Sequence, residues 1–150
     1  DFQGDEDAIR AVLDAGPEIY NHNTETVPRL YKRARPGGRY ERVLGIFRFA
    51  KAHAPHIPTK TGIILGLGET NEEVLQTMRE LRGVDVDILT LGQYLRPSVD
   101  HIELDRYVTP EEFRMLRNEG MEMGFKHVES GPLVRSSYHA WEQVQSAGVA

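Results

Sequence analysis

The stretch PTKTGIILGLGETNEE, residues 58–73, decides the fold class of this chain. Its run from Ile63 to Leu65 is apolar at consecutive positions, which is typical of a strand covered on both faces, as in parallel sheets. Thr70 and Glu73 then have the spacing of a capping box, which predicts that a helix begins there. A buried strand that leads directly into a helix is one unit of a parallel α/β fold.

The same alternation continues on both sides of this stretch. We expect strands at residues 18–21, 58–67, 87–91 and 126–128. We expect helices at residues 7–15, from about 26 to 35, 40–53, 70–82 and 109–124. Alternation of this kind predicts parallel strands with right-handed crossovers and outer helices. The strands are too few to close a barrel, so the pattern fits part of a barrel or an open wound sheet.

Composition limits the class of protein. A chain of 150 residues, 39% hydrophobic and 27% charged, fits one ordinary globular domain. The net charge of −5 gives no sign of nucleic-acid binding, and no apolar run reaches the roughly 20 residues that cross a membrane. The chain has no Cys, so it supplies no disulfide, cysteine nucleophile or thiolate ligand. The composition says little about the cell compartment, although nothing in it argues for secretion.

Polar or glycine-rich segments follow three of the expected strands: residues 21–25 (NHNTE), 66–69 (GLGE) and 92–97 (GQYLRP). In parallel α/β sheets ligands bind at the C-terminal ends of the strands, so we expect these segments to meet on one rim. Asn side chains suit ribose hydroxyls or a carboxylate, and glycines let a ligand approach the backbone. Turns and helix caps explain the same residues without a ligand. Neither G-x-G-x-x-G nor a phosphate-binding P-loop is present.

Three other features allow chemical interpretations. The six histidines are scattered, with no H-x-x-x-H pair, so we do not expect a zinc site. Lys60 lies in an expected strand and is a candidate Schiff-base lysine of an aldolase-like enzyme; a polar contact to substrate or solvent is the competing interpretation. Residues 131–140, GPLVRSSYHA, are dense in hydrogen-bonding groups. They fit an anion or metal contact, or a strap packed over the domain.

Taken together, these segments resemble the lipoyl synthase family of radical S-adenosylmethionine (SAM) enzymes. The resemblance extends from Asp1 to about Glu142. It is carried, in the family's order, by YNHNTETV (20–27), PTKTG (58–62), GLGET (66–70), GQYL (92–95), RYVTPEEF (106–113) and SGPLVRSSYHA (130–140). The resemblance implies the C-terminal half of a partial (β/α)6 radical-SAM barrel at residues 1–129. A C-terminal strap with the RSSYH segment then follows at residues 130–150.

The resemblance also implies an activity. Family members insert two sulfur atoms, at C6 and C8 of an octanoyl chain that is carried on a lysine of a lipoyl carrier domain. They use SAM and two [4Fe–4S] clusters, one that cleaves SAM and an auxiliary one that is sacrificed as the sulfur donor. The implied partners are the octanoylated carrier, an electron donor and the missing N-terminal half, without nucleic acid or membrane.

The resemblance assigns eight residues to cofactor binding: Asn21, Asn23, Glu25, Gly62, Ile64, Gly66, Glu69 and Arg135. Four of them, Gly62 to Glu69, match the pattern G-x-I-x-G-x-x-E that is associated with the adenine of SAM. Asn21, Asn23 and Glu25, at and after the end of the first strand, are assigned by their place on the rim. The arginine is implied to orient the auxiliary cluster or a carboxylate of SAM.

Ser137 corresponds to the family's serine ligand of the auxiliary cluster. An oxygen ligand is poorer for iron than a thiolate, which suits a cluster that is dismantled. The six cysteine ligands are expected upstream of Asp1, so this chain carries one of seven protein ligands and none of the catalytic residues. We expect the isolated chain to hold no iron and to cleave no SAM, with an unpaired sheet edge and an uncovered inner face. The alternative is a cysteine-free module that binds SAM or a carrier.

Overall fold

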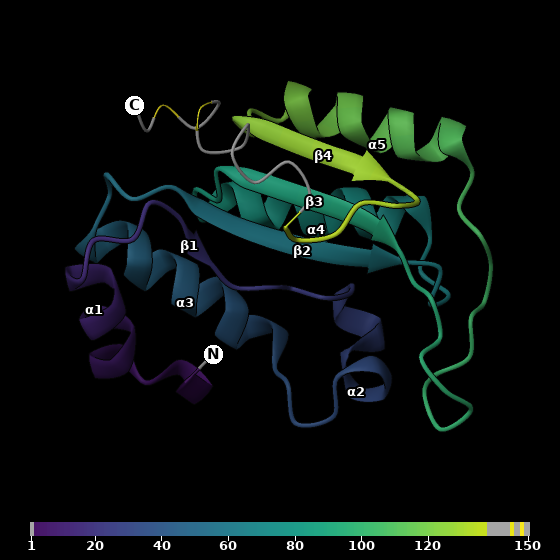
Figure 1. The fold of residues 1–150 in the computed structure, drawn as a ribbon, viewed down its shortest axis with the longest axis horizontal. Coiled ribbons are helices and arrows are strands. Elements are labelled where there is room, and N and C mark those ends of the chain that lie inside the picture. The colour runs from purple at the N-terminus through teal and green to yellow at the C-terminus, as the bar shows by residue number, and fades with distance from the viewer. Residues whose placement is uncertain (1, 138–144, 146–147, 149–150) are drawn as a thin grey trace.

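The computed structural model describes residues 2–137, 145 and 148, and shows a four-stranded sheet in the order β1-β2-β3-β4 (Figure 1). The strands are β1 (Tyr20–Asn21), β2 (Thr59–Leu65), β3 (Ile88–Gln93) and β4 (His127–Gly131). Each strand is parallel to its neighbour, with Lys60 beside Ile88 and Ile88 beside His127. The predicted parallel α/β fold is therefore confirmed.

The helices are α1 (Glu6–Asp14), α2 (Tyr31–Ala34), α3 (Tyr40–His53), α4 (Asn71–Gly83) and α5 (Pro110–Glu122), with two 3-10 turns, η1 (Phe2–Gly4) and η2 (Pro28–Leu30). None of the helices in the described part of the chain is long and apolar enough to span a membrane.

Local sequence explains where most of these helices begin. The capping box of Thr70 and Glu73 opens α4 as predicted, although the helix includes Gly83, which we expected to end it. The helix expected from about residue 26 is instead η2 followed by the single turn of α2. Pro28 stands at the first position of η2, and the Pro36-Gly37-Gly38 segment prevents continuation beyond α2, because neither Pro nor Gly supports a helix interior.

One face of the sheet carries the main hydrophobic core. Alternate residues of β2 and β3 pack there against α3, α4 and α5; they include Ile63, Leu65, Leu89, Leu91, Val43, Phe47, Val74, Met78, Leu81, Phe113 and Leu116. A second cluster attaches α1 to α3 through Ile9, Leu13, Ile46 and Ala50. Helices on this face leave the other face of β2 and β3 available for a site.

The chain returns across that other face after β4, in front of β3 and β2 (Figure 1). The carbonyl oxygen of Val134 lies 2.5 Å from the point that a Cβ on Gly92 would occupy, and the ammonium of Lys60 donates to the carbonyl of Ser136. The expectation of an uncovered inner face is therefore wrong where residues 134–136 cross it. The reason is that hydrogen bonds to the sheet hold this segment in place.

The division into residues 1–129 and 130–150 stays a prediction. Strand β4 continues to Gly131, so the sheet extends two residues beyond the expected division. Of the RSSYH segment, residues 135–137 are described, while Tyr138 and His139 lie outside the described residues.

Candidate functional site

A cavity of about 340 Å³ opens where the strands end, over the face that the helices leave free. Its walls come from the segment after β1, from β2, from β3 with the loop that follows, and from the segment after β4; they include Asn23, Glu25, Gly62, Ile64, Thr90, Gly92, Tyr94, Val134 and Arg135. The segments that follow β1 and β3 meet at this cavity as expected, whereas β2 contributes Gly62, Ile63 and Ile64, and residues 66–69 do not line it. Parallel strands place their C-terminal ends on the same side of a sheet, which explains this result.

Asn23 presents an unused acceptor at this cavity. Its side-chain Oδ1 is buried and has no hydrogen-bond partner within the described residues, while its backbone carbonyl accepts from Arg35 at 2.9 Å. Gly62 has no side chain between Asn23 and the cavity; a Cβ there would lie 3.2 Å from Oδ1. A buried acceptor without a partner costs about 1–3 kcal/mol. A ligand hydroxyl or amine would recover that free energy.

Glu25 lies beside it in a strained backbone conformation. Its φ of 72° is in the left-handed region, which is uncommon for residues other than glycine. Two backbone hydrogen bonds hold it there, from its own amide to Gly62 at 2.9 Å and from the amide of Ile64 to its carbonyl at 2.8 Å. Strain of this kind is frequent at binding sites. Asn21, two residues before Asn23, is exposed and does not line the cavity.

The G-x-I-x-G-x-x-E residues divide into two groups. Gly62 and Ile64 line the cavity. Glu69 is buried below the turn, where its carboxylate accepts from the amides of Gly66 at 2.6 Å and Leu67 at 2.9 Å. A Cβ on Gly66 would lie 2.5 Å from the carbonyl of Arg106. Glu69 and Gly66 therefore shape the turn, and do not line the cavity.

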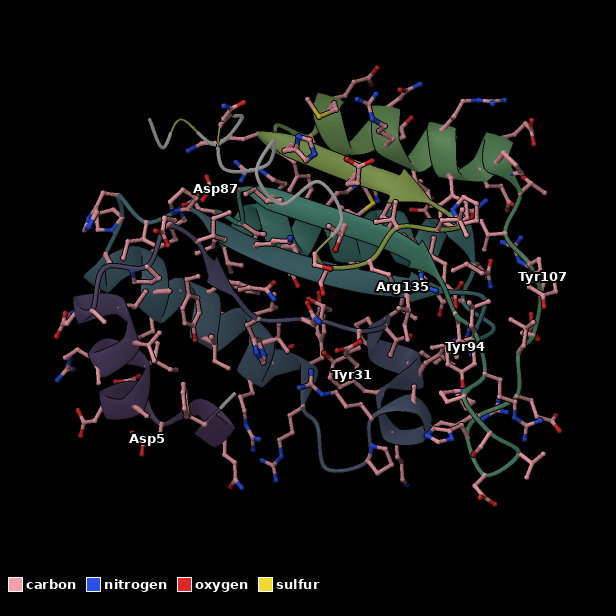
Figure 2. All side chains as sticks on the ribbon, in the orientation of Figure 1. Asp5, Tyr31, Asp87, Tyr94, Tyr107 and Arg135 are labelled. Carbon is pink, nitrogen blue, oxygen red and sulfur yellow. The ribbon has the colours of Figure 1, made fainter. Side chains whose placement is uncertain are left out.

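Arg135 and Ser137 lie on the segment that crosses the sheet. Arg135 is exposed toward the cavity and its Nη1 donates to the carbonyl of Val134 at 2.7 Å. It lies near the C-terminal part of the sheet with Tyr94, whereas Asp87 lies at the other end (Figure 2). Ser137 is exposed and follows Ser136, which lines the cavity.

Lys60 makes its polar contact within the chain. Only 5% of the residue is exposed, its ammonium donates to the carbonyl of Ser136, and burial lowers the pKa of its amine. This contact is to the protein backbone, and Lys60 does not line the cavity. The Schiff-base role and the contact to substrate both stay predictions. Within residues 2–137, no three His, Asp or Glu side chains come together to hold a metal ion.

Sequence reasoning did not assign individual roles to Gln93 and Tyr94, although it placed both on the rim. The Gln93 amide nitrogen lies 3.1 Å from the carbonyl of Leu65 and 3.2 Å from that of Arg106, and its oxygen accepts from the amide of Val108 at 2.9 Å. Gln93 thus ties the long loop after β3 to the sheet. The signal in the sequence that could have indicated this role is the position of Gln93, a polar residue, at the end of a buried strand.

His22 points away from the cavity, although Asn23 lines it. The His22 ring packs near Phe47 of α3, with ring centroids 6.1 Å apart, and the residue is 8% exposed. Burial and the nearby charge of Arg35 lower the pKa of His22 from 6.5 to about 4. The ring is therefore neutral near pH 7.

His22 should make the fold sensitive to acid. Below pH 6.5 the unfolded chain binds a proton at His22 that the folded chain does not bind until about pH 4, so the free energy of unfolding falls over this interval. The expected contribution is roughly 3 kcal/mol. Urea unfolding of the whole protein across this pH range measures it. His22→Leu should flatten the dependence and the same change at exposed His56 should not; equal curves would contradict the prediction.

Comparison with known proteins agrees with this geometry. The Radical SAM superfamily model matches residues 1–81. A lipoyl synthase of Koribacter versatilis is 62% identical over 146 residues, 97% of this chain and 48% of the relative. One of Rubrobacter xylanophilus is 57% identical over 147 residues, 98% of this chain and 46% of the relative. The chain spans about half the length of the curated relatives it matches. With this sequence and this fold, the chain belongs to the radical SAM superfamily.

Proposed function

We propose that this chain is part of a lipoyl synthase, which inserts two sulfur atoms at C6 and C8 of an octanoyl group. The octanoyl group is carried on a lysine of a lipoyl carrier domain. The observation that carries this proposal is the cavity at the strand ends, in a chain 62% identical to a lipoyl synthase. The carrier domain, an electron donor and the part of the protein outside this chain are the proposed partners, and a bacterial cytoplasm is the proposed location.

The residues of the cavity fit SAM. A volume of about 340 Å³ lies within the range of roughly 300–1,000 Å³ that small-molecule sites occupy. The unpartnered Oδ1 of Asn23 suits a ribose hydroxyl, the apolar side chain of Ile64 suits the adenine ring, and the guanidinium of Arg135 suits a carboxylate. When bound and cleaved after one-electron reduction by the electron donor, SAM would supply the radical species that abstracts hydrogen.

The chain's own residues then have separable roles in the proposal. Asn23, Glu25 and Arg135 bind and orient the ligand, and Gly62 leaves room for it. Gly66 and Glu69 hold the turn that follows Ile64, and so act on the ligand through the backbone. Asn21 stays a predicted contact, since it lies outside the cavity wall.

The two [4Fe–4S] clusters do not fit this chain alone. The sequence contains 0 Cys, and the described residues form no group of His, Asp and Glu that could hold iron. We therefore assign to this chain only Ser137, as an oxygen ligand of the auxiliary cluster. Every thiolate ligand must come from residues outside the chain.

The test is an assay of the whole protein that contains this chain. After anaerobic reconstitution with iron and sulfide, it is incubated with SAM, dithionite and an octanoylated carrier domain. We expect lipoyl groups on the carrier, by mass spectrometry, together with 5′-deoxyadenosine. A carrier without the octanoyl group is the control and should gain no sulfur. Absence of lipoyl product from a reconstituted, folded protein would contradict the proposal.

The absence of Cys favours one second candidate, a cysteine-free module that binds SAM or a carrier. The coding sequence in frame upstream of Asp1 distinguishes the two. The motifs C-x4-C-x5-C and C-x3-C-x2-C support the synthase, and a stop codon followed by a start codon at Asp1 supports the module. In either case the isolated chain should retain no stoichiometric iron and produce no 5′-deoxyadenosine.

A further inference from the structure

One wall of the cavity comes from the closing segment, which we define as residues Val134–Ser137. Val134 is buried, and its amide donates to the carbonyl of Gly131 at 3.2 Å. Its own carbonyl lies 2.5 Å from the point that a Cβ on Gly92 would occupy. Only a residue without a side chain at position 92 lets the closing segment lie this close to β3. Gly92 thus leaves the space that the closing segment occupies against β3.

Lys60 attaches the closing segment to the sheet from the neighbouring strand β2. Its ammonium donates to the carbonyl of Ser136, and the residue is almost completely buried. Lysine is rarely buried, because its charge loses hydration unless the protein supplies acceptors. A charge-assisted hydrogen bond of this kind is stronger than one between neutral groups. The acceptor carbonyl belongs to the residue between Arg135 and Ser137, so the bond controls where both side chains lie.

We propose that Lys60 is a positioning residue that holds the closing segment as a wall of the cavity. It acts through the backbone of Ser136 and sets the positions of Arg135 and Ser137. This inference rests on the proposed function for the roles of those two side chains. The attachment itself is a property of the fold, and can be tested without any cofactor.

The experiment measures how often the closing segment leaves the sheet. In the whole protein under native conditions, trypsin cleaves the Arg135–Ser136 bond only when this segment detaches, and mass spectrometry follows that cleavage. Lys60→Met keeps the unbranched apolar stem and removes the donor, so cleavage should be about tenfold faster. Lys60→Arg keeps a donor and should restore most of the protection. The same Lys→Met change at exposed Lys32 is the matched control and should leave the rate unchanged.

Gly92→Ala tests the close approach of the closing segment to β3 without altering Lys60. Its Cβ would displace the carbonyl of Val134, so it should also accelerate cleavage at the same bond. Equilibrium dialysis supplies the second measurement, and SAM should bind about tenfold more weakly to Lys60→Met than to the wild type.

The outcomes separate this inference from the proposed function. Cleavage at Arg135–Ser136 that is as slow in Lys60→Met as in the wild type overturns the inference, whatever the SAM affinity. A uniform increase at every tryptic site in both Lys60→Met and Gly92→Ala also overturns it, because that is global unfolding. Selective cleavage in Lys60→Met with no SAM binding by the wild type supports the positioning role and contradicts the proposed function.

Discussion

Replacing Asp87 by asparagine is expected to lower the free energy of unfolding by about 3–5 kcal/mol. Asp87 immediately precedes β3, at the N-terminal end of the sheet and far from the cavity (Figure 2). It is 5% exposed. Its carboxylate accepts from Lys51 of α3 at 2.5 Å, from Lys126 before β4 at 3.1 Å and from the amide of Thr59 at 2.9 Å. One side chain therefore joins two strands, a helix and the residue that leads into β4.

The charge of Asp87 is what the substitution removes. Burial alone would raise the pKa of this carboxyl, but the hydrogen bonds from Lys51, Thr59 and Lys126 outweigh burial and hold the pKa below its usual range. The group is therefore ionised in the folded protein. An amide in its place leaves the largely buried ammonium of Lys51 without a counter-charge, which is the costly way to break a buried ion pair.

Asp85→Asn is the matched control for this prediction. This substitution makes the same chemical change two positions earlier in the chain, where the side chain is exposed. Its φ of 60° is left-handed, which asparagine tolerates well. Urea unfolding of the whole protein should therefore separate the two variants, with Asp85→Asn close to the wild type. Similar stabilities for both variants would show that the ion pairs of Asp87 contribute little.

Ser137→Ala is expected to reduce the number of lipoyl groups formed per SAM cleaved by roughly 100-fold, in the whole protein. Even residues that only support metal ligands cost about 10–100-fold when they are replaced, and Ser137 is proposed as a ligand itself. Ser137→Cys replaces the oxygen with a thiolate, which binds iron more strongly. We expect this variant to retain the auxiliary cluster and to release its sulfur more slowly than the wild type.

Ser98→Ala is the control for Ser137. It makes the same chemical change at an exposed serine that does not line the cavity, so the product ratio should stay near that of the wild type. Mössbauer spectra of the reconstituted variants supply a measurement that is independent of turnover. If Ser137→Ala and Ser137→Cys both give the wild-type ratio and spectrum, the role of Ser137 as a ligand is wrong.

Local sequence patterns were sufficient for most of the elements and for much of the rim. The apolar run from Ile63 to Leu65 lies in β2, and Thr70 with Glu73 opens α4, because both signals depend on neighbours within a few residues. The meeting of the strand ends then follows from parallel order alone. The predicted helix from about residue 26 failed because its local signals were weak between prolines and glycines.

The sequence by itself therefore determined the parallel α/β class, the order of the elements, the rim and the resemblance to a radical SAM family. Only the tertiary structure decided which polar groups meet. It placed Glu69 under its own turn, Asn23 at the cavity, His22 among apolar groups and Lys60 against Ser136. Periodicity is a short-range property of the chain, whereas each of these partnerships depends on how the closing segment, the helices and the sheet pack together.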